Sequence, residues 1–190
     1  MKRVSSMLRS HRLLTLAAVA VLVAAGSAAA YTGASFNYKT ANPSNVFTAG
    51  ILSHNNTKAG SAIVTAAAME PGQSSQGTVT IKNTGNVAGT FSVSKSAIAD
   101  VAGANGGLLS SVLKISVDDI TVPASPVNKY NNTLTAFSNV ALGTLAAGAS
   151  ATYQITLTFP DGGVPTSNTT GDNAFQGSSL TFQLDWTSVQ

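Results

Sequence analysis

The sequence predicts an all-β protein, a single antiparallel β-sandwich of the jelly-roll or Ig-like kind, preceded by an N-terminal signal helix that is cleaved. Three observations lead to this prediction. Several runs alternate apolar and polar residues with period two, which is typical of strands that bury one face and expose the other. Clusters of Gly, Pro, Asn and Asp separate these runs, as they do in sandwiches of many short strands. The start of the chain differs from the rest, because it is basic and then apolar apart from Thr15.

The leader at 1–30 has the three parts of a secretory signal peptide. A basic start is followed by a short apolar stretch at 13–25 and by small residues at Ala28 and Ala30, the −3 and −1 positions of a cleavage before Tyr31. The apolar stretch is shorter than the roughly 20 residues that span a bilayer. We therefore predict cleavage by signal peptidase and a secreted protein. The alternative is an uncleaved leader, which would then be the only membrane attachment.

Without this leader the chain is no longer basic. The whole sequence has 10 Lys and Arg and 7 Asp and Glu, a formal net charge of +3. Four of the basic residues, including every arginine, lie in the leader, so 31–190 keeps six lysines against seven acids, a net charge of −1. Nucleic-acid binding needs clustered Lys and Arg that displace counterions from phosphates. We therefore predict no nucleic-acid partner and no patch for anionic membranes.

The predicted organisation is a signal peptide at 1–30, an extended N-terminal segment at 31–45 and one β-sandwich domain at 46–190. The exported part has the size of a single domain, which buries about 70% of its unfolded surface. It can therefore fold without disulfides, in keeping with the absence of cysteine. Only 9% of the residues are charged, against about 25% in a typical domain. A surface of Ser, Thr and Asn with so few charges suits side-by-side packing of copies.

Four runs give the strongest strand signals. In 152–159, for example, Tyr153, Ile155 and Leu157 share one face, while Thr and Gln residues occupy the other. The four predicted strands are 78–82, 91–94, 152–159 and 180–186. Weaker strand candidates are 46–52, 62–69, 113–117, 120–122 and 134–140. Trp186, the only tryptophan, is expected to lie in the core with inward residues of the other strands. These are Phe182, Tyr153, Ile155, Leu157, Val79, Ile81 and Phe91.

Turn residues mark the connections between the strands. Pro71 and Gly72 predict a turn before the first strong strand, and 83–86 (NTGN) predicts a hairpin to the second. Loops are predicted at 102–107, 123–132, 161–163 and 165–173. Only 97–113 could hold a short helix, and its glycines weaken that prediction.

The exported part lacks the side chains that common catalytic sites need. Zinc hydrolysis uses two or three histidines with a glutamate base, yet 31–190 has one histidine, His54, and one glutamate, Glu70. With no cysteine and no Gly-x-Ser-x-Gly elbow, nucleophilic catalysis is unsupported. We expect His54 to be solvated and the aspartates to cap turns or face solvent. These aspartates are Asp118, Asp119, Asp161 and Asp172. We therefore predict no catalytic residue, no cofactor and no metal site.

Four segments, taken in order, match the pattern of one group of secreted proteins. Residues 45–52 (NVFTAGIL) resemble an N-x-F-x-A-G-x-L segment, and 70–85, with its Pro-Gly turn and NTG end, resembles the part that follows. Residues 142–153 (LGTLAAGASATY) resemble a Leu-x-x-Gly approach to a long strand, and 172–177 (DNAFQG) a closing DN-x-x-Q-G. The chain thus resembles the camelysin/TasA family of secreted bacterial proteins, which carry a SipW-type signal peptide.

The resemblance implies two functions. TasA-like members are extracellular matrix proteins whose sandwich polymerises into biofilm fibres, and the N-terminal segment of one subunit completes the sheet of the next. Camelysin-like members are described as cell-surface metalloendopeptidases, which a single histidine does not favour. A third alternative is an adhesin that binds a surface polymer through its Thr- and Asn-rich face.

We expect a secreted structural protein at the cell surface or in the matrix that assembles with copies of itself or with a related subunit. Residues 31–41 are the candidate donor strand. Ala34, Phe36 and Tyr38 alternate, so they could fill a groove while the backbone pairs with a strand edge. A terminus without regular structure is the alternative.

Overall fold

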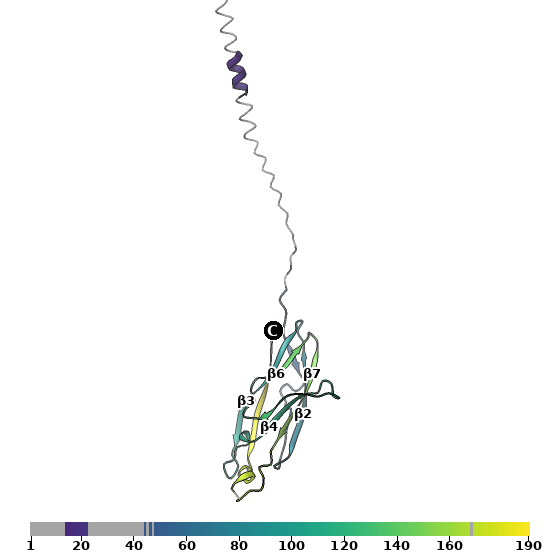
Figure 1. Ribbon diagram of the computed structural model, residues 1–190, viewed down its shortest axis with the longest axis vertical. Helices are drawn as coiled ribbons and strands as arrows, with labels where there is room; N and C mark the ends of the chain where they lie inside the picture. Colours follow the sequence, from purple (N-terminus) through teal and green to yellow (C-terminus); the bar gives the residue numbers. More distant parts are fainter. Residues whose placement is uncertain (1–13, 23–43, 45, 47, 168) are drawn as a thin grey trace, which may run out of the picture. The chain divides into compact units, whose positions relative to one another are not determined.

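The computed structural model describes residues 14–22, 44, 46, 48–167 and 169–190, and the chain divides into two units, Met1–Phe47 and Thr48–Gln190 (Figure 1). In the first unit, residues 14–22 form a helix. Within the described ranges no helix combines the length and apolarity that crossing a membrane requires. The predicted cleavage residues and donor residues lie outside the described residues. They are Ala28, Ala30 and Tyr31, and Ala34, Phe36 and Tyr38.

The second unit is a sandwich of two antiparallel sheets, which confirms the all-β prediction. One sheet has five strands in the order β1-β2-β7-β4-β5, and the other has three in the order β6-β3-β8. The elements are β1 (His54–Asn56), β2 (Ser74–Asn83), β3 (Gly89–Val101), η1 (Leu109–Ser111), β4 (Lys114–Asp119), β5 (Val127–Thr133), β6 (Val140–Leu145), β7 (Ser150–Thr158), η2 (Gly171–Phe175) and β8 (Ser179–Val189).

The pairing of β2 with β7 sets the faces of the five-stranded sheet. Val79 lies opposite Tyr153, and Ile81 lies opposite Ala151. These four side chains are buried, while the residues between them are Thr, Gln and Lys at the outer surface. The period-two alternation of the sequence thus becomes one core face and one polar face.

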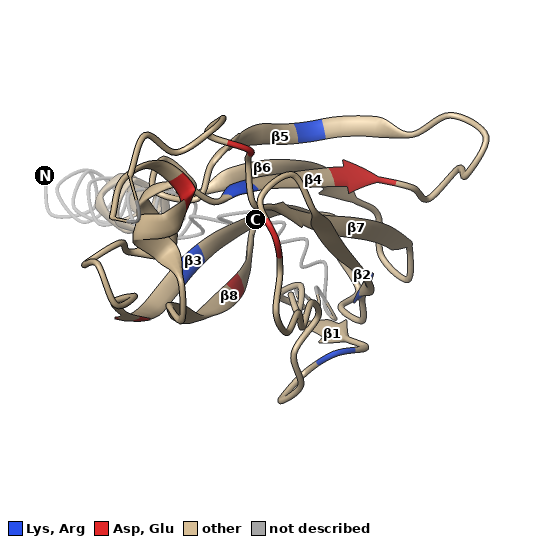
Figure 2. Cartoon of the chain, turned by 90° about the horizontal axis from the view of Figure 1, so that it is seen from below, with Lys and Arg blue, Asp and Glu red and all other residues tan. Residues whose placement is uncertain are grey.

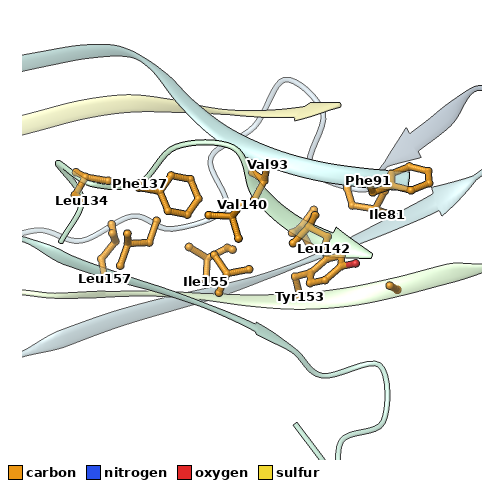
Figure 3. Packing of buried hydrophobic residues seen from close by; sticks show 14 of the residues in the cluster. Ile81, Phe91, Val93, Leu134, Phe137, Val140, Leu142, Tyr153, Ile155 and Leu157 are labelled. Atoms are coloured by element: carbon orange, nitrogen blue, oxygen red, sulfur yellow. The ribbon is translucent and has the colours of Figure 1, made fainter. Parts of the chain in front are cut away.

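The core fills the space between the sheets (Figure 3). Six of the predicted core residues are at most 8% exposed, namely Val79, Ile81, Phe91, Tyr153, Ile155 and Leu157. The connection from β5 to β6 adds Leu134 and Phe137, both with no exposed surface. The ring of Phe137 meets that of Tyr130 edge-on, with the centroids 5.0 Å apart. Irregular chain therefore contributes large side chains to this core alongside the strands.

The hairpin predicted at 83–86 is wrong. β2 belongs to the five-stranded sheet and β3 to the three-stranded sheet, so the turn carries the chain from one sheet to the other. Asn83 holds this turn from inside the protein, where it has no exposed surface. Its side-chain amide donates to the carbonyls of Val87 and Leu145, and its side-chain oxygen accepts from the amide of Gly85. The turn signal was right, but the partner of each strand is set by contacts far along the chain.

Several weaker predictions also differ from the structure. The predicted loop at 123–132 contains most of β5, an edge strand whose polar sequence (VNKYNNT) gives no apolar alternation. Segments 62–69 and 120–122, and the described residues of 46–52, form no strand, and 134–140 is mostly turn. The possible helix at 97–113 is instead the end of β3 followed by the short 3₁₀ turn η1.

Candidate functional site, a groove beside strand β8

Strand β8 lies at the edge of the three-stranded sheet. One side of β8 pairs with β3, from Val189 opposite Thr90 to Ser179 opposite Val101. No strand in the described part of the chain pairs with its other side. Such an edge leaves backbone N–H and C=O groups available along the whole strand, which here is 11 residues long.

A groove of about 1440 Å³ borders this edge. Every residue from Ser178 to Trp186 lines the groove. Neighbouring residues of a strand point to opposite faces of the sheet. The groove therefore runs along the edge of β8 and not along one of its faces. Segment 58–69 lines the groove as well, together with buried residues of β7. The large apolar side chains that line it while only partly buried are Ile63, Val64, Met69, Leu109, Phe175, Leu180, Phe182, Leu184 and Trp186. The groove therefore combines an open strand edge with an apolar lining.

The side chain of Trp186 was predicted to be buried, and it is only partly so. Its ring packs against that of Tyr153, with the centroids 5.6 Å apart. Its indole nitrogen is buried, and among the described residues it has no hydrogen-bond partner. Phe182 is likewise only partly buried. Both side chains stay partly exposed because β8 is an edge strand. In the described domain, no further strand lies beside β8 to cover the sides of the two rings that face the groove.

Segment 61–69 approaches β2 closely at Gly77. A β-carbon built at Gly77 would lie 1.8 Å from the carbonyl oxygen of Ile63. Only glycine, which has no side chain, therefore leaves room for the backbone of this segment beside β2. Ile63, Val64 and Met69 then pack against the edge of the core.

The side chain of His54 is half-buried in β1, so the expectation of a solvated loop histidine is wrong. Its Nδ1 atom lies 3.1 Å from the hydroxyl oxygen of Ser188 on β8. Its ring meets Phe91 edge-on with the centroids 5.8 Å apart. The contact joins the two sheets near one end of the groove. In the described chain no hydrogen bond links His54 to a carboxylate, so the pair lacks the orienting acid of a catalytic triad.

The aspartates serve local structure. Asp161 accepts from the amide of Gly163, and Asp172 from that of Gly162. Asp119 accepts from Thr121 and lies 3.6 Å from the ammonium of Lys129. Asp118 accepts from the side-chain amide of Asn128. Within the described residues, no group of three or more His, Asp or Glu could hold a metal ion. Figure 2 shows the charged residues spread over different strands.

Tyr153 is the titratable group that lies deepest in the core near the groove, with 1% of its surface exposed. Burial, reinforced by the charge of Asp119, raises the pKa of its hydroxyl to about 12, from an ordinary value of 10.0. The folded state therefore keeps this proton at a pH at which the unfolded chain releases it. This stabilisation is complete below pH 10 and is lost as the pH rises to about 12.

We expect the free energy of unfolding to fall across this pH window by up to about 1.4 kcal/mol per pH unit because of Tyr153 alone. Denaturant titrations of the natural chain and of Tyr153→Phe check this, because the variant should lack that part of the fall. The two proteins differ only at this side chain, so every other group contributes equally to both curves. If the free energy of unfolding falls equally with pH in the two proteins, the raised pKa of Tyr153 is not the cause of the fall.

The fold and groove together define a class, an antiparallel β-sandwich with an apolar groove beside one of its open sheet edges. No family model and no curated protein matches the sequence. Among solved structures, the chain is similar to AvmM, described as catalysing macrocyclization in alchivemycin A biosynthesis. The identity is 12% and the TM-score 0.31, over 72% of this chain and 86% of that one. A likeness at this TM-score carries no inference about activity.

Proposed function

We propose that this chain is an exported structural subunit that assembles at the cell surface or in the extracellular matrix by β-strand addition. Residues 31–41 of one copy enter the groove of the next and pair with the free side of β8. The observation that carries the proposal is the free edge of β8 beside an apolar groove.

The dimensions of donor and acceptor agree. Residues 31–41 would form an extended strand of about 36 Å at 3.3 Å per residue, and β8 has the same number of residues, 11. The groove, at about 1440 Å³, is larger than the roughly 300–1,000 Å³ of typical small-molecule pockets. An elongated polypeptide is therefore a better occupant than a compact ligand.

The chemistry of the two partners also agrees. Ala34, Phe36 and Tyr38 would share one face of the donor strand and meet the apolar lining at Leu180, Leu184 and their neighbours. Burying an aromatic or aliphatic side chain contributes about 1.5–3 kcal/mol, and each backbone hydrogen bond adds a net 0.5–1.5 kcal/mol or so. A few such contacts suffice for stable association.

The low charge of the exported part supports contact between copies. Residues 31–190 carry six lysines and seven acids, a net charge of −1, so like-charge repulsion between subunits is small. The outer face of the five-stranded sheet adds pairs of hydroxyl groups, such as Thr80 with Thr152 at 2.9 Å. Such a surface can lie against another copy with few charged side chains at the contact, of which Lys82 is one.

Electron microscopy and light scattering of protein that begins at Tyr31 test the proposal. We expect this protein to form fibres and the same protein without residues 31–41 to stay a folded monomer, because the donor is absent while the described domain is intact. Protein that keeps its leader should assemble more slowly, since the leader tethers the donor segment. If the protein from Tyr31 stays monomeric at every concentration and pH tested, the proposed function is wrong.

A further inference from the structure

We propose that segment 62–69 is a second acceptor strand, which stays unpaired in the monomer and becomes a strand when a donor enters the groove. The donor, residues 31–41 of a second copy, would then be hydrogen-bonded on both sides, to β8 and to 62–69. This inference rests on the proposed function and adds to it the partner on the far side of the groove.

The sequence of this segment favours a strand. Ile63, Val64 and Thr65 are consecutive β-branched residues, the type that fits a pleated strand best. The structure nevertheless has no strand over 62–69. A stretch with strand propensity but no strand partner is the combination expected of a strand whose neighbour comes from another chain.

The backbone of this segment is largely available for pairing. In the described part of the chain, its hydrogen bonds to protein consist of one contact, from the hydroxyl of Ser75 to the carbonyl of Thr65, at 3.0 Å. The preceding stretch differs, since the amides of Ala59 and Ser61 bond within their own turn. Most residues of 62–69 are exposed, so water satisfies their backbone groups in the monomer and can be replaced.

The segment is held in place at both of its ends. Near its start, the carbonyl of Ile63 rests against Gly77 of β2. At its end, Met69 packs on the core, and the following turn is fixed by the amide of Gly72, which donates to the carbonyl of Phe159. The segment lines the same groove as β8. Up to Ala67 it can therefore take up strand geometry without a large movement of the chain, whereas Ala68, at φ 51°, lies in the left-handed region and would have to change its backbone conformation.

Pairing on both sides of the donor determines whether the filled groove still has an exposed strand edge. A donor paired with β8 alone would itself become a new exposed edge, which is prone to further, unspecific pairing. A donor that also pairs with 62–69 leaves no free edge in the groove. The arrangement limits each groove to one donor and so favours a linear fibre.

Hydrogen–deuterium exchange on the whole chain tests the inference. The probe is an excess of a synthetic peptide with the sequence of residues 31–41, and a scrambled peptide is the control. We expect amides of 62–69 and of β8 to exchange at least ~10-fold more slowly with the true peptide, because paired strand amides open rarely. Protection of β8 without protection of 62–69 would overturn this inference and leave the proposed function standing. Protection of neither would overturn both.

Proline substitution gives a second measurement. Ala66 is exposed, and its amide has no hydrogen bond in the described structure, so Ala66→Pro should leave the monomer's thermal unfolding nearly unchanged. It removes one donor from the proposed strand, and we expect at least ~10-fold weaker binding of the 31–41 peptide. Ala147→Pro, at an exposed position in the turn between β6 and β7 whose amide also has no hydrogen bond in the described structure, is the matched control and should bind normally. Equal binding by both variants of unchanged fold would contradict the second acceptor strand.

Discussion

Phe36→Asp is expected to abolish assembly of the protein that begins at Tyr31 while leaving its folded domain intact. Phe36 is the central residue of the three that share one face of the proposed donor strand. In the groove its replacement would place a carboxylate among Leu180, Phe182 and Leu184. A charge that loses water without gaining a partner costs several kcal/mol. The lost burial of the phenyl ring adds about 1.5–3 kcal/mol, so the critical concentration should rise by at least ~100-fold.

Ser35→Asp is the matched control, because it adds the same charge one residue earlier. In an extended strand, neighbouring side chains point to opposite faces, so the carboxylate introduced at this position would face away from the groove. We expect this variant to form fibres at close to the natural concentration, as measured by sedimentation and electron microscopy. If both variants fail alike, charge rather than groove filling controls assembly. If both assemble normally, residues 31–41 are not the donor.

The strands could be predicted where local pattern and final environment agree. The alternation in 152–159 places Tyr153, Ile155 and Leu157 on one face, and the structure buries all three. β5 could not be predicted in this way, because an edge strand with polar residues on both faces has no apolar period. The turn at 83–86 shows a second limit of prediction from local sequence. Its residues specify a reversal, but a hairpin and a crossing between sheets need the same local chemistry.

The groove could not be predicted for a related reason. Leu180, Phe182, Leu184 and Trp186 alternate as clearly as the residues of β7, and alternation predicts only that they face the inside of the sandwich. Whether they are covered depends on a strand beyond β8, which the described domain lacks. His54 likewise gave no signal, because its partner Ser188 lies 134 residues away. An alternating apolar face therefore predicts that a strand packs on the core, but it does not predict that the strand is completely covered.

The difference between core and groove leads to the second large effect, which compares two phenylalanines. Phe137 has no exposed surface and contacts Tyr130 edge-on, so Phe137→Ala should lower the free energy of unfolding by about 3–5 kcal/mol. This is a large part of the roughly 5–15 kcal/mol that stabilises a typical domain. Phe182 lines the groove and packs against the core from one side. Its truncation should cost the monomer about half as much or less, since water already reaches the ring.

Assembly should rank the same two variants in the opposite order once each is folded. Phe182→Ala removes lining that the donor strand would cover, so we expect its fibres to form only at a raised protein concentration. Phe137→Ala leaves the lining unchanged, so at low temperature, where the variant remains folded, it should assemble nearly normally. Urea titration of the monomers and sedimentation of the fibres give the two rankings. Equal losses of stability would mean that Phe182 is as fully covered in solution as Phe137, and the groove beside β8 would then be closed to a donor.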